Sequence, residues 1–186
     1  MQQLRFSRLL KRSPSRFPRA AFLFVNSFIT IAILSAIAMF TRTPFIFPSL
    51  GPTAFLFFYA PDSPTASPRH TIFGHAIGIL CGFGALWICG LTNALPTTEV
   101  GVSLSRIFAA ALSLAATGAL MILLKSEHPP AGATTLIVSL GIVSKPFHLL
   151  LIEVAVALLA LQAIIINRLA GLHYPVWTMR NDGGLK

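Results

Sequence analysis

Charged side chains are scarce in this sequence, and acidic ones are the scarcest. Only 10% of the 186 residues are charged, against roughly a quarter in soluble domains, and just five residues are Asp or Glu. A soluble domain needs more charge than this to cover its surface, so the composition excludes that class. With 55% hydrophobic residues and a mean hydropathy of +0.78, the chain is predicted to be an all-α membrane protein.

The sequence also lacks the motifs on which catalysis and metal binding depend. It has no His-Glu-x-x-His motif, no phosphate-binding glycine loop, no nucleophile elbow and no pair of acids at a working spacing. Its two cysteines, Cys81 and Cys89, lie eight residues apart in one apolar segment, about 12 Å along a helix and too far for a disulfide. We therefore expect no enzyme activity, no catalytic residues, no cofactor and no metal site.

Positive charge is concentrated at the N-terminus. The net charge is +9, and six of the fourteen Lys and Arg precede the first apolar stretch: Arg5, Arg8, Lys11, Arg12, Arg16 and Arg19. Basic residues beside a span set its orientation and attract anionic lipids. We interpret residues 1–19 as a cytoplasmic tail rather than a nucleic-acid-binding arm, with a short organellar transit peptide as the alternative. The prediction is a protein of the bacterial inner membrane with both termini in the cytoplasm.

Four apolar stretches are long enough to cross the roughly 30 Å hydrocarbon core as helices. They cover residues 20–40, 71–91, 107–124 and 149–166. The last contains a single charge, Glu153. We expect this carboxylate in the first turn of its helix, where it suits the helix dipole.

Two further apolar stretches are short and broken. Residues 44–60 contain three prolines, and residues 129–143 begin with two prolines followed by a glycine. Proline and glycine at these places forbid a continuous helix. Each stretch is predicted to be an extended segment followed by a half-helix that begins near Gly51 or Gly132.

The two broken segments match each other when the chain is shifted by 81 residues, the spacing of Gly51 and Gly132. The same shift lays the first long span over the third and the second over the fourth. We predict an internal two-fold repeat with halves 20–91 and 101–172, within a transmembrane domain 20–170 that a tail 171–186 follows. The broken segments either cross fully, which makes the halves inverted, or are re-entrant; full crossing is favoured because inverted repeats are common in transporters.

Irregular backbone at membrane depth is tolerated where it lines a cavity or packs against protein. A half-helix N-terminus offers unpaired N–H groups and a positive dipole end, which suit an anion. The predicted substrate-binding residues are hydroxyls beside the two breaks, the two glycines and two histidines: Ser49, Gly51, Thr53, His75, His128, Gly132, Thr134 and Thr135. The alternative is that the breaks only shape the bundle.

His75 lies on a helix face with three glycines at intervals of four residues, Gly74, Gly78 and Gly82. Such a ladder of small residues permits close packing of a neighbouring helix. The imidazole on this face is expected either to hydrogen-bond that neighbour or to face a transport pathway.

The run Glu127-His128-Pro129-Pro130-Ala131-Gly132-Ala133-Thr134 resembles the signature of the HPP family of integral membrane proteins. Residues 48–54 and the run Pro68-Arg69-His70 with Gly74-His75 also resemble family blocks. The resemblance covers about residues 20–170. The family is described as having four transmembrane helices. Members in plastids and cyanobacteria are associated with nitrite transport, so the resemblance implies nitrite or a related anion as the substrate.

Residues and resemblance together predict a transporter or channel for a small inorganic anion, bound at two facing half-helix N-termini. A bundle of this size is expected to form a homo-oligomer such as a dimer in the lipid bilayer. Two other functions remain open at this point. One is a membrane scaffold or subunit that transports nothing, and the other is a proton-coupled carrier of a small neutral solute.

Overall fold

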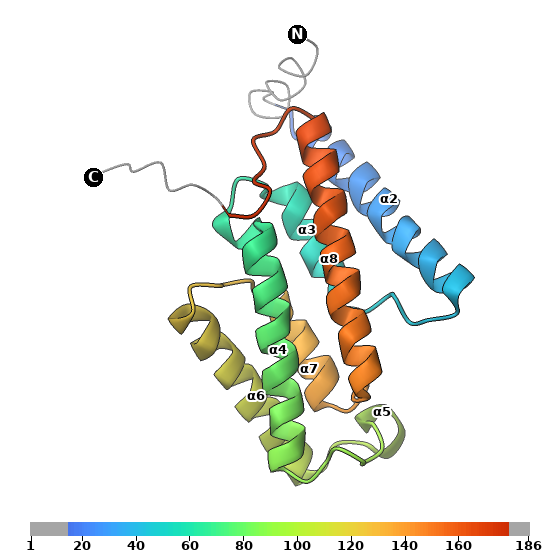
Figure 1. The fold of residues 1–186 in the computed structure, drawn as a ribbon, viewed down its shortest axis with the longest axis vertical. Helices are drawn as coiled ribbons and strands as arrows, with labels where there is room; N and C mark the ends of the chain where they lie inside the picture. The colour runs from blue at the N-terminus through green and yellow to red at the C-terminus, as the bar shows by residue number, and fades with distance from the viewer. Residues whose placement is uncertain (1–14, 179–186) are drawn as a thin grey trace.

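The computed structural model describes residues 15–178, and all the regular structure in that range is helical (Figure 1). Its four long apolar helices are α2 (Phe17–Thr41), α4 (Pro68–Ile88), α6 (Leu104–Leu123) and α8 (Pro146–Leu169). Each has the length and hydropathy of a membrane span, so the predicted four spans and the all-α class are confirmed. Most of the basic tail and the last eight residues, which include Arg180 and Lys186, lie outside the described range.

Short helices form in both broken segments. They are α3 (Leu50–Tyr59) and α7 (Ala131–Ser139), and two shorter elements, η1 (Pro64–Ala66) and α5 (Thr97–Val100), lie in connections. α3 begins one residue before Gly51 and α7 one residue before Gly132, which confirms the predicted half-helices. At 1.5 Å per residue each is about 14–15 Å long, roughly half the hydrocarbon thickness.

The chain path places the start of both short helices inside the bundle. In Figure 1, α2 runs downward from the upper end and ends near mid-height, and after a connecting loop α3 runs upward. α6 runs upward from the lower end to about mid-height, and after a connecting loop α7 runs downward. α4 packs against α6 and α7, while α8 packs against α2 and α3; α4 and α8 also contact each other. α3 and α7 therefore start near the middle and point in opposite directions.

The surface of the bundle is apolar, and polar side chains are buried inside it beside an apolar core. Large apolar side chains are exposed on the outer faces of the long helices, among them Phe24, Phe28, Leu80, Trp87 and Phe108. Hydroxyl and imidazole side chains are buried instead, including Thr30, Thr53, His75, Thr117 and His128. An outer surface of this kind is stable in lipid rather than water, so the protein is an integral membrane protein.

The glycine ladder of α4 lies directly against α7 and the residues before it. A Cβ added at Gly74 would lie 2.6 Å from the Cβ of His128, and one at Gly82 would lie 2.8 Å from the Cβ of Val138. At Gly78 it would lie 2.9 Å from the carbonyl oxygen of Ala131. The close packing predicted from the glycine spacing is confirmed.

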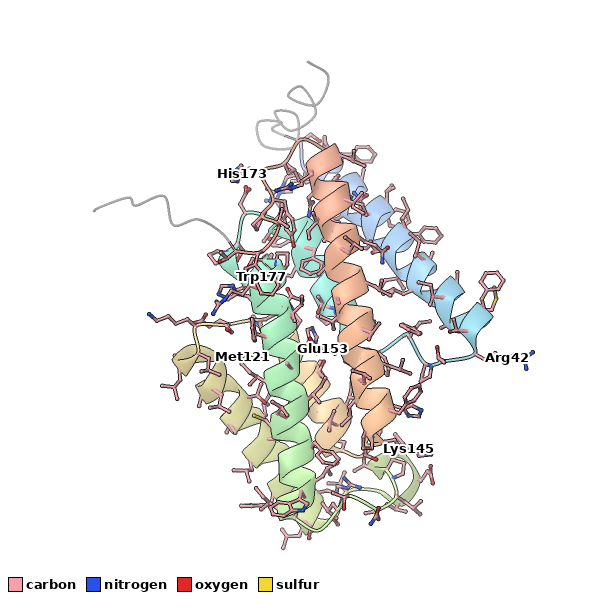
Figure 2. The ribbon with its side chains drawn as sticks, viewed as in Figure 1. Arg42, Met121, Lys145, Glu153, His173 and Trp177 are labelled. Carbon is pink, nitrogen blue, oxygen red and sulfur yellow. The ribbon has the colours of Figure 1, made fainter. Side chains whose placement is uncertain are left out.

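The expectation for Glu153 is wrong. α8 begins at Pro146, three residues before the apolar run, and its first turn contains no acidic residue. Proline is a favourable first residue because its missing N–H would have no helical partner there. Glu153 therefore lies in the third turn, in the central part of the molecule in Figure 2. Both of its carboxylate oxygens are buried and have no hydrogen-bond partner within residues 15–178.

Arg106 closes the far end of α7. Its side chain is on α6 and only 2% exposed, and its guanidinium donates to the carbonyl oxygens of Ser139 (3.1 Å), Leu95 (2.9 Å) and Ala94 (3.4 Å). Ser139 is the last residue of α7, and its carbonyl has no partner within the helix. The guanidinium supplies that partner, while the three carbonyls before it accept from backbone N–H groups of residues 140–143.

The segment after α8 is fixed to the start of α4. The Tyr174 hydroxyl donates to the carbonyl of Ala66, and Arg168 Nε donates to the carbonyl of Tyr174 at 3.0 Å. The backbone N–H of Arg69 donates to the carbonyl of Trp177 at 2.9 Å. Burial raises the pKa of the Tyr174 hydroxyl, so this group remains a donor.

Candidate functional site

The two short helices are joined through one imidazole. His75, on α4, is completely buried. Its Nε2 lies 3.0 Å from the Thr53 hydroxyl on α3, and its Nδ1 lies 2.7 Å from the Thr134 hydroxyl on α7. Thr53 and Thr134 are 81 residues apart, each two residues after its glycine. One ring therefore bridges matching positions of two segments that are distant in sequence.

His128 extends this cluster toward η1. Its ring centroid lies 5.1 Å from that of His75, and its Nε2 lies 3.3 Å from the Thr53 hydroxyl. Its Nδ1 lies 2.7 Å from the carbonyl oxygen of Thr65. A carbonyl oxygen only accepts, so Nδ1 carries a proton, and Nε2 of the neutral ring is an acceptor.

The donors and acceptors orient His75. The Thr53 hydroxyl has one proton and two acceptors within reach, the Ser49 carbonyl at 3.0 Å and Nε2 of His128 at 3.3 Å. With its proton given to either acceptor, Thr53 accepts from Nε2–H of His75, whose Nδ1 accepts from the Thr134 hydroxyl. The cluster thus links α7 through His75 to Thr53, which reaches either the Ser49 carbonyl or His128. Its four side chains, Thr53, His75, His128 and Thr134, are all 0% exposed, and hydrogen bonds are electrostatically strong in such surroundings.

Ser49 adds an unused donor at the start of α3. It is the N-cap residue of α3, and its carbonyl accepts a hydrogen bond from the Thr53 hydroxyl at 3.0 Å. Its own hydroxyl is completely buried and has no hydrogen-bond partner among the residues the structure describes. A buried hydroxyl without a partner is costly, and this one lies at the N-terminus of α3, where the N–H groups of Leu50 and Gly51 donate to the carbonyls of Phe47 and Pro48.

Three of the predicted residues lie apart from the cluster. The Thr135 hydroxyl contacts Thr117 on α6 at 2.9 Å and donates to the carbonyl of Ala131. Gly51 is exposed, and a Cβ there would meet nothing within 4 Å. A Cβ at Gly132 would lie 3.3 Å from Leu114.

Residues 12–175 match the sequence family described as "HPP, transmembrane region". The chain belongs to the HPP family. Two Dictyostelium discoideum proteins, both described as transmembrane proteins, are similar to this HPP protein. One is 35% identical over 162 residues, covering 82% of this chain and 49% of the relative. The other is 29% identical over 160 residues, covering 81% and 53%.

The HPP chain thus spans about half the length of the curated relatives that it matches. No solved structure matches it. The run that resembles the family signature contains two of the four clustered side chains, His128 and Thr134.

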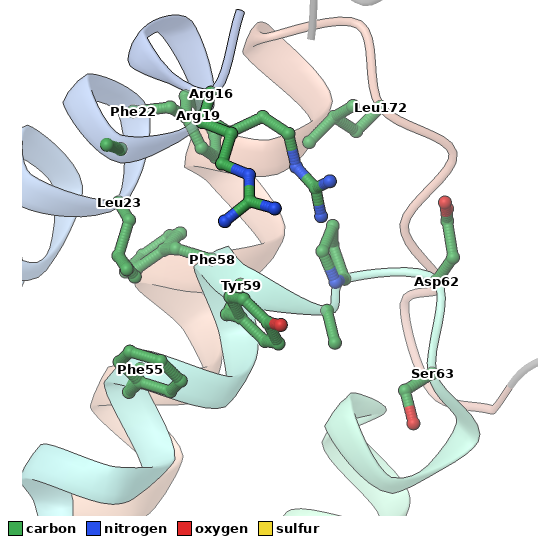
Figure 3. A pocket seen from close by; sticks show the side chains of 13 residues that line it. Arg16, Arg19, Phe22, Leu23, Phe55, Phe58, Tyr59, Asp62, Ser63 and Leu172 are labelled. Atoms are coloured by element: carbon green, nitrogen blue, oxygen red, sulfur yellow. The ribbon is translucent and has the colours of Figure 1, made fainter. Parts of the chain in front are cut away.

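A cavity of about 970 Å³ lies in this HPP protein between the start of α2 and the end of α3 (Figure 3). Arg16 and Arg19 line one side of it, and Phe55, Phe58 and Tyr59 line another. Tyr59 is six residues beyond Thr53 on α3, about 9 Å along the axis. The cavity is therefore separate from the buried cluster and lies nearer the end where α2 starts.

Sequence reasoning did not identify two members of the cluster. The Thr65 carbonyl could not be singled out from the sequence, because every residue has a backbone carbonyl. Thr71 Oγ1 lies 3.4 Å from His128 Nδ1, and it precedes His75 by four residues on α4. A spacing of four residues puts Thr71 and His75 on one helix face, so this spacing in the sequence could have indicated Thr71 as a neighbour of the cluster.

Proposed function

We propose that this HPP-family protein moves a small inorganic anion, nitrite or a related anion, across the membrane and catalyses no reaction. One observation carries the proposal: a buried histidine bridges threonines at matching positions of two short helices. Both helices begin inside the bundle. Their N-terminal ends are thus brought to one place in the membrane interior, which is the geometry expected for binding an anion there.

The energetics of anion transfer favour this place. A small anion that leaves water for a low-dielectric interior loses several kcal/mol of hydration even after relaxation. Helix N-termini and hydroxyl donors offset that loss without a permanent full charge. The cluster contains no Lys or Arg, and the buried Arg106 is bonded to the opposite end of α7. The Ser49 hydroxyl is a donor ready for an anion, because it has no partner among residues 15–178.

We infer that residues 20–91 and 101–172 are inverted repeats. The support is the path of the chain: α2, α3 and α4 run down, up and down, while α6, α7 and α8 run up, down and up (Figure 1). The contacts follow the same pattern, since α4 packs on α6 and α7 as α8 packs on α2 and α3. On this interpretation both broken segments cross the membrane, and alternating access comes from movement of one half against the other.

The same proposal places the protein in a bacterial inner membrane, as a homo-oligomer such as a dimer, with both ends in the cytoplasm. α2 starts and α8 ends on one side of the bundle (Figure 1), which supports a common side for both termini. The cavity with Arg16 and Arg19 lies on that side. Its positive groups would gather anions at the cytoplasmic mouth of the pathway.

The test is uptake into liposomes by purified protein against a panel of anions, with anion-dependent thermal stabilisation as the binding measurement. Thr53→Val and Thr134→Val keep shape and remove one hydroxyl each. An anion would accept the hydroxyl proton of Thr53 or Thr134 in place of the present partner, and losing that hydrogen bond in a variant should cost about 1.5–3 kcal/mol, or roughly 10- to 150-fold in affinity. Thr98→Val changes an exposed threonine of α5 and is the matched control.

If both buried variants transport and bind anions as the wild type does, the site is wrong. Absence of uptake together with absence of stabilisation by any anion would favour the scaffold function instead. Uptake of a neutral solute that follows pH and ignores competing anions would favour the proton-coupled neutral carrier.

A further inference from the structure

The four long helices contain a single acidic residue, Glu153. It follows the start of α8 by seven residues, about 10 Å along the helix axis. That depth lies within the hydrocarbon region and nearer the end of the bundle away from the cavity and the start of α2. In the view of Figure 2, Glu153 lies between α4 and α8, away from the ends of both.

The carboxyl group of Glu153 has no partner among residues 15–178. Both oxygens are buried, and neither accepts a hydrogen bond. Ionisable groups on the helices packed against α8 are Arg19, Tyr59, Arg69, His70, His75 and Cys81. None of them is a hydrogen-bond or ion-pair partner of Glu153.

Several of these groups are engaged elsewhere. His75 binds the two threonines, and the Arg69 guanidinium donates to the carbonyl of Lys125. On α8 itself, Arg168 donates to the carbonyl of Tyr174, and His148 precedes Glu153 by five residues, which puts it on a different helix face. No positive group within the described residues compensates an ionised Glu153.

A carboxylate in these surroundings is disfavoured, because it loses hydration and gains neither an ion pair nor a hydrogen bond. The protonated carboxyl avoids most of that cost. Ionisable side chains inside membrane spans mark pathways of protons or ions. If residue 153 served packing alone, leucine or glutamine would fill the position at a lower cost in free energy.

We propose that Glu153 is a proton-binding site that couples proton movement to passage of the anion. This inference rests on the proposed transport function, and it names the proton as the ion whose movement is coupled to that transport. Glu153 takes up one proton from the side where α8 begins and releases it to the other side as one anion crosses. No other bond forms or breaks, and a monovalent anion then crosses with no net charge.

The first test is labelling with dicyclohexylcarbodiimide, which reacts with protonated carboxyls in apolar surroundings. The carboxyl proton moves to a nitrogen of the reagent, the carboxylate oxygen bonds its central carbon, and the acyl group then shifts to nitrogen to give a stable acylurea. Purified protein is labelled at mildly acidic and mildly alkaline pH, and peptides are mapped by mass spectrometry. Glu153 should be labelled, more strongly in acid, while Glu99, an exposed acid next to Val100, should not. Unlabelled Glu153, or equal labelling of Glu99, overturns the proposal.

The second test measures nitrite uptake into liposomes with and without an inward proton gradient, after subtraction of protein-free liposomes because nitrous acid itself crosses lipid. The gradient should accelerate uptake by the wild type and by Glu99→Gln. In Glu153→Gln the ratio of the two rates should fall to one. A ratio that stays at the wild-type value, or acceleration by a sodium gradient in place of a proton gradient, overturns the coupling role. A wild type that transports no anion refutes the proposed function, and labelling still decides whether Glu153 binds a proton.

Discussion

Replacing Gly78 with alanine should loosen the contact between α4 and α7. The new Cβ would lie 2.8 Å from the Thr135 hydroxyl oxygen and 2.9 Å from the Ala131 carbonyl oxygen. The hydroxyl can rotate away, but the carbonyl is backbone of the first turn of α7. The short helix must therefore move, and it carries Thr134 of the candidate site with it.

The magnitude follows from two opposing terms. Overpacking a tight contact costs about 1–3 kcal/mol, while alanine is intrinsically better than glycine in a helix by about 1 kcal/mol. Gly84→Ala is the matched control, because it lies on the same helix and a Cβ there meets nothing within 4 Å. Comparing the two variants cancels the helix-propensity term, so Gly78→Ala should be less stable than Gly84→Ala by about 1–3 kcal/mol. For a chain of this length that corresponds to about 2–12 °C in Tm.

Thermal unfolding of the purified variants in one detergent measures the difference directly. Anion-dependent stabilisation of the same samples shows whether the shift of α7 also weakens binding. Equal melting temperatures for Gly78→Ala and Gly84→Ala would refute the close contact from which the prediction is worked.

Three further outcomes are expected. Arg106→Ala should cost about 1–3 kcal/mol, because the buried carbonyl of Ser139 at the end of α7 loses its donor; exposed Lys145→Ala is the control, and equal melting of the pair would contradict the capping role. Tyr174→Phe should cost a similar amount through the unpaired carbonyl of Ala66, and a melting point no lower than that of the exposed-site variant Tyr59→Phe would speak against it. Topology is tested with single cysteines near positions 5 and 182, which lie outside the described residues, in a variant that lacks Cys81 and Cys89. These cysteines should resist labelling from outside intact cells. Labelling of either one would contradict the proposed orientation.

Local signals were enough to predict most of the secondary structure. Four apolar runs gave the four long helices, and prolines with Gly51 and Gly132 gave the starts of α3 and α7, because hydropathy and backbone restriction act over a few residues. Helix ends were less accurate. The apolar run that contains Glu153 starts at residue 149, but the helix starts at Pro146, so the acid lies in the third turn of the helix and not in the first.

Contacts between distant segments could not be predicted from the sequence. The histidines and threonines of the cluster were identified as candidates, but their pairing across α3, α4 and α7 depends on how the helices pack. Arg106 lies just before the apolar stretch 107–124, where a charge is usually exposed, yet it is buried against Ser139, 33 residues away in sequence. Its role arises because the last carbonyls of a short buried helix need donors, a requirement that no local pattern records.

The single imidazole between Thr53 and Thr134 has an evolutionary consequence. On the inferred repeat, the residue 81 positions after His75 is Val156, which is also completely buried. A homodimer of half-length chains would place two copies of such a ring at its symmetry axis, or none. One ring serving two matching threonines therefore requires two halves that differ in sequence. A common ancestor of the halves could have supplied the paired threonines, but the lone histidine between them became possible only after the two copies diverged.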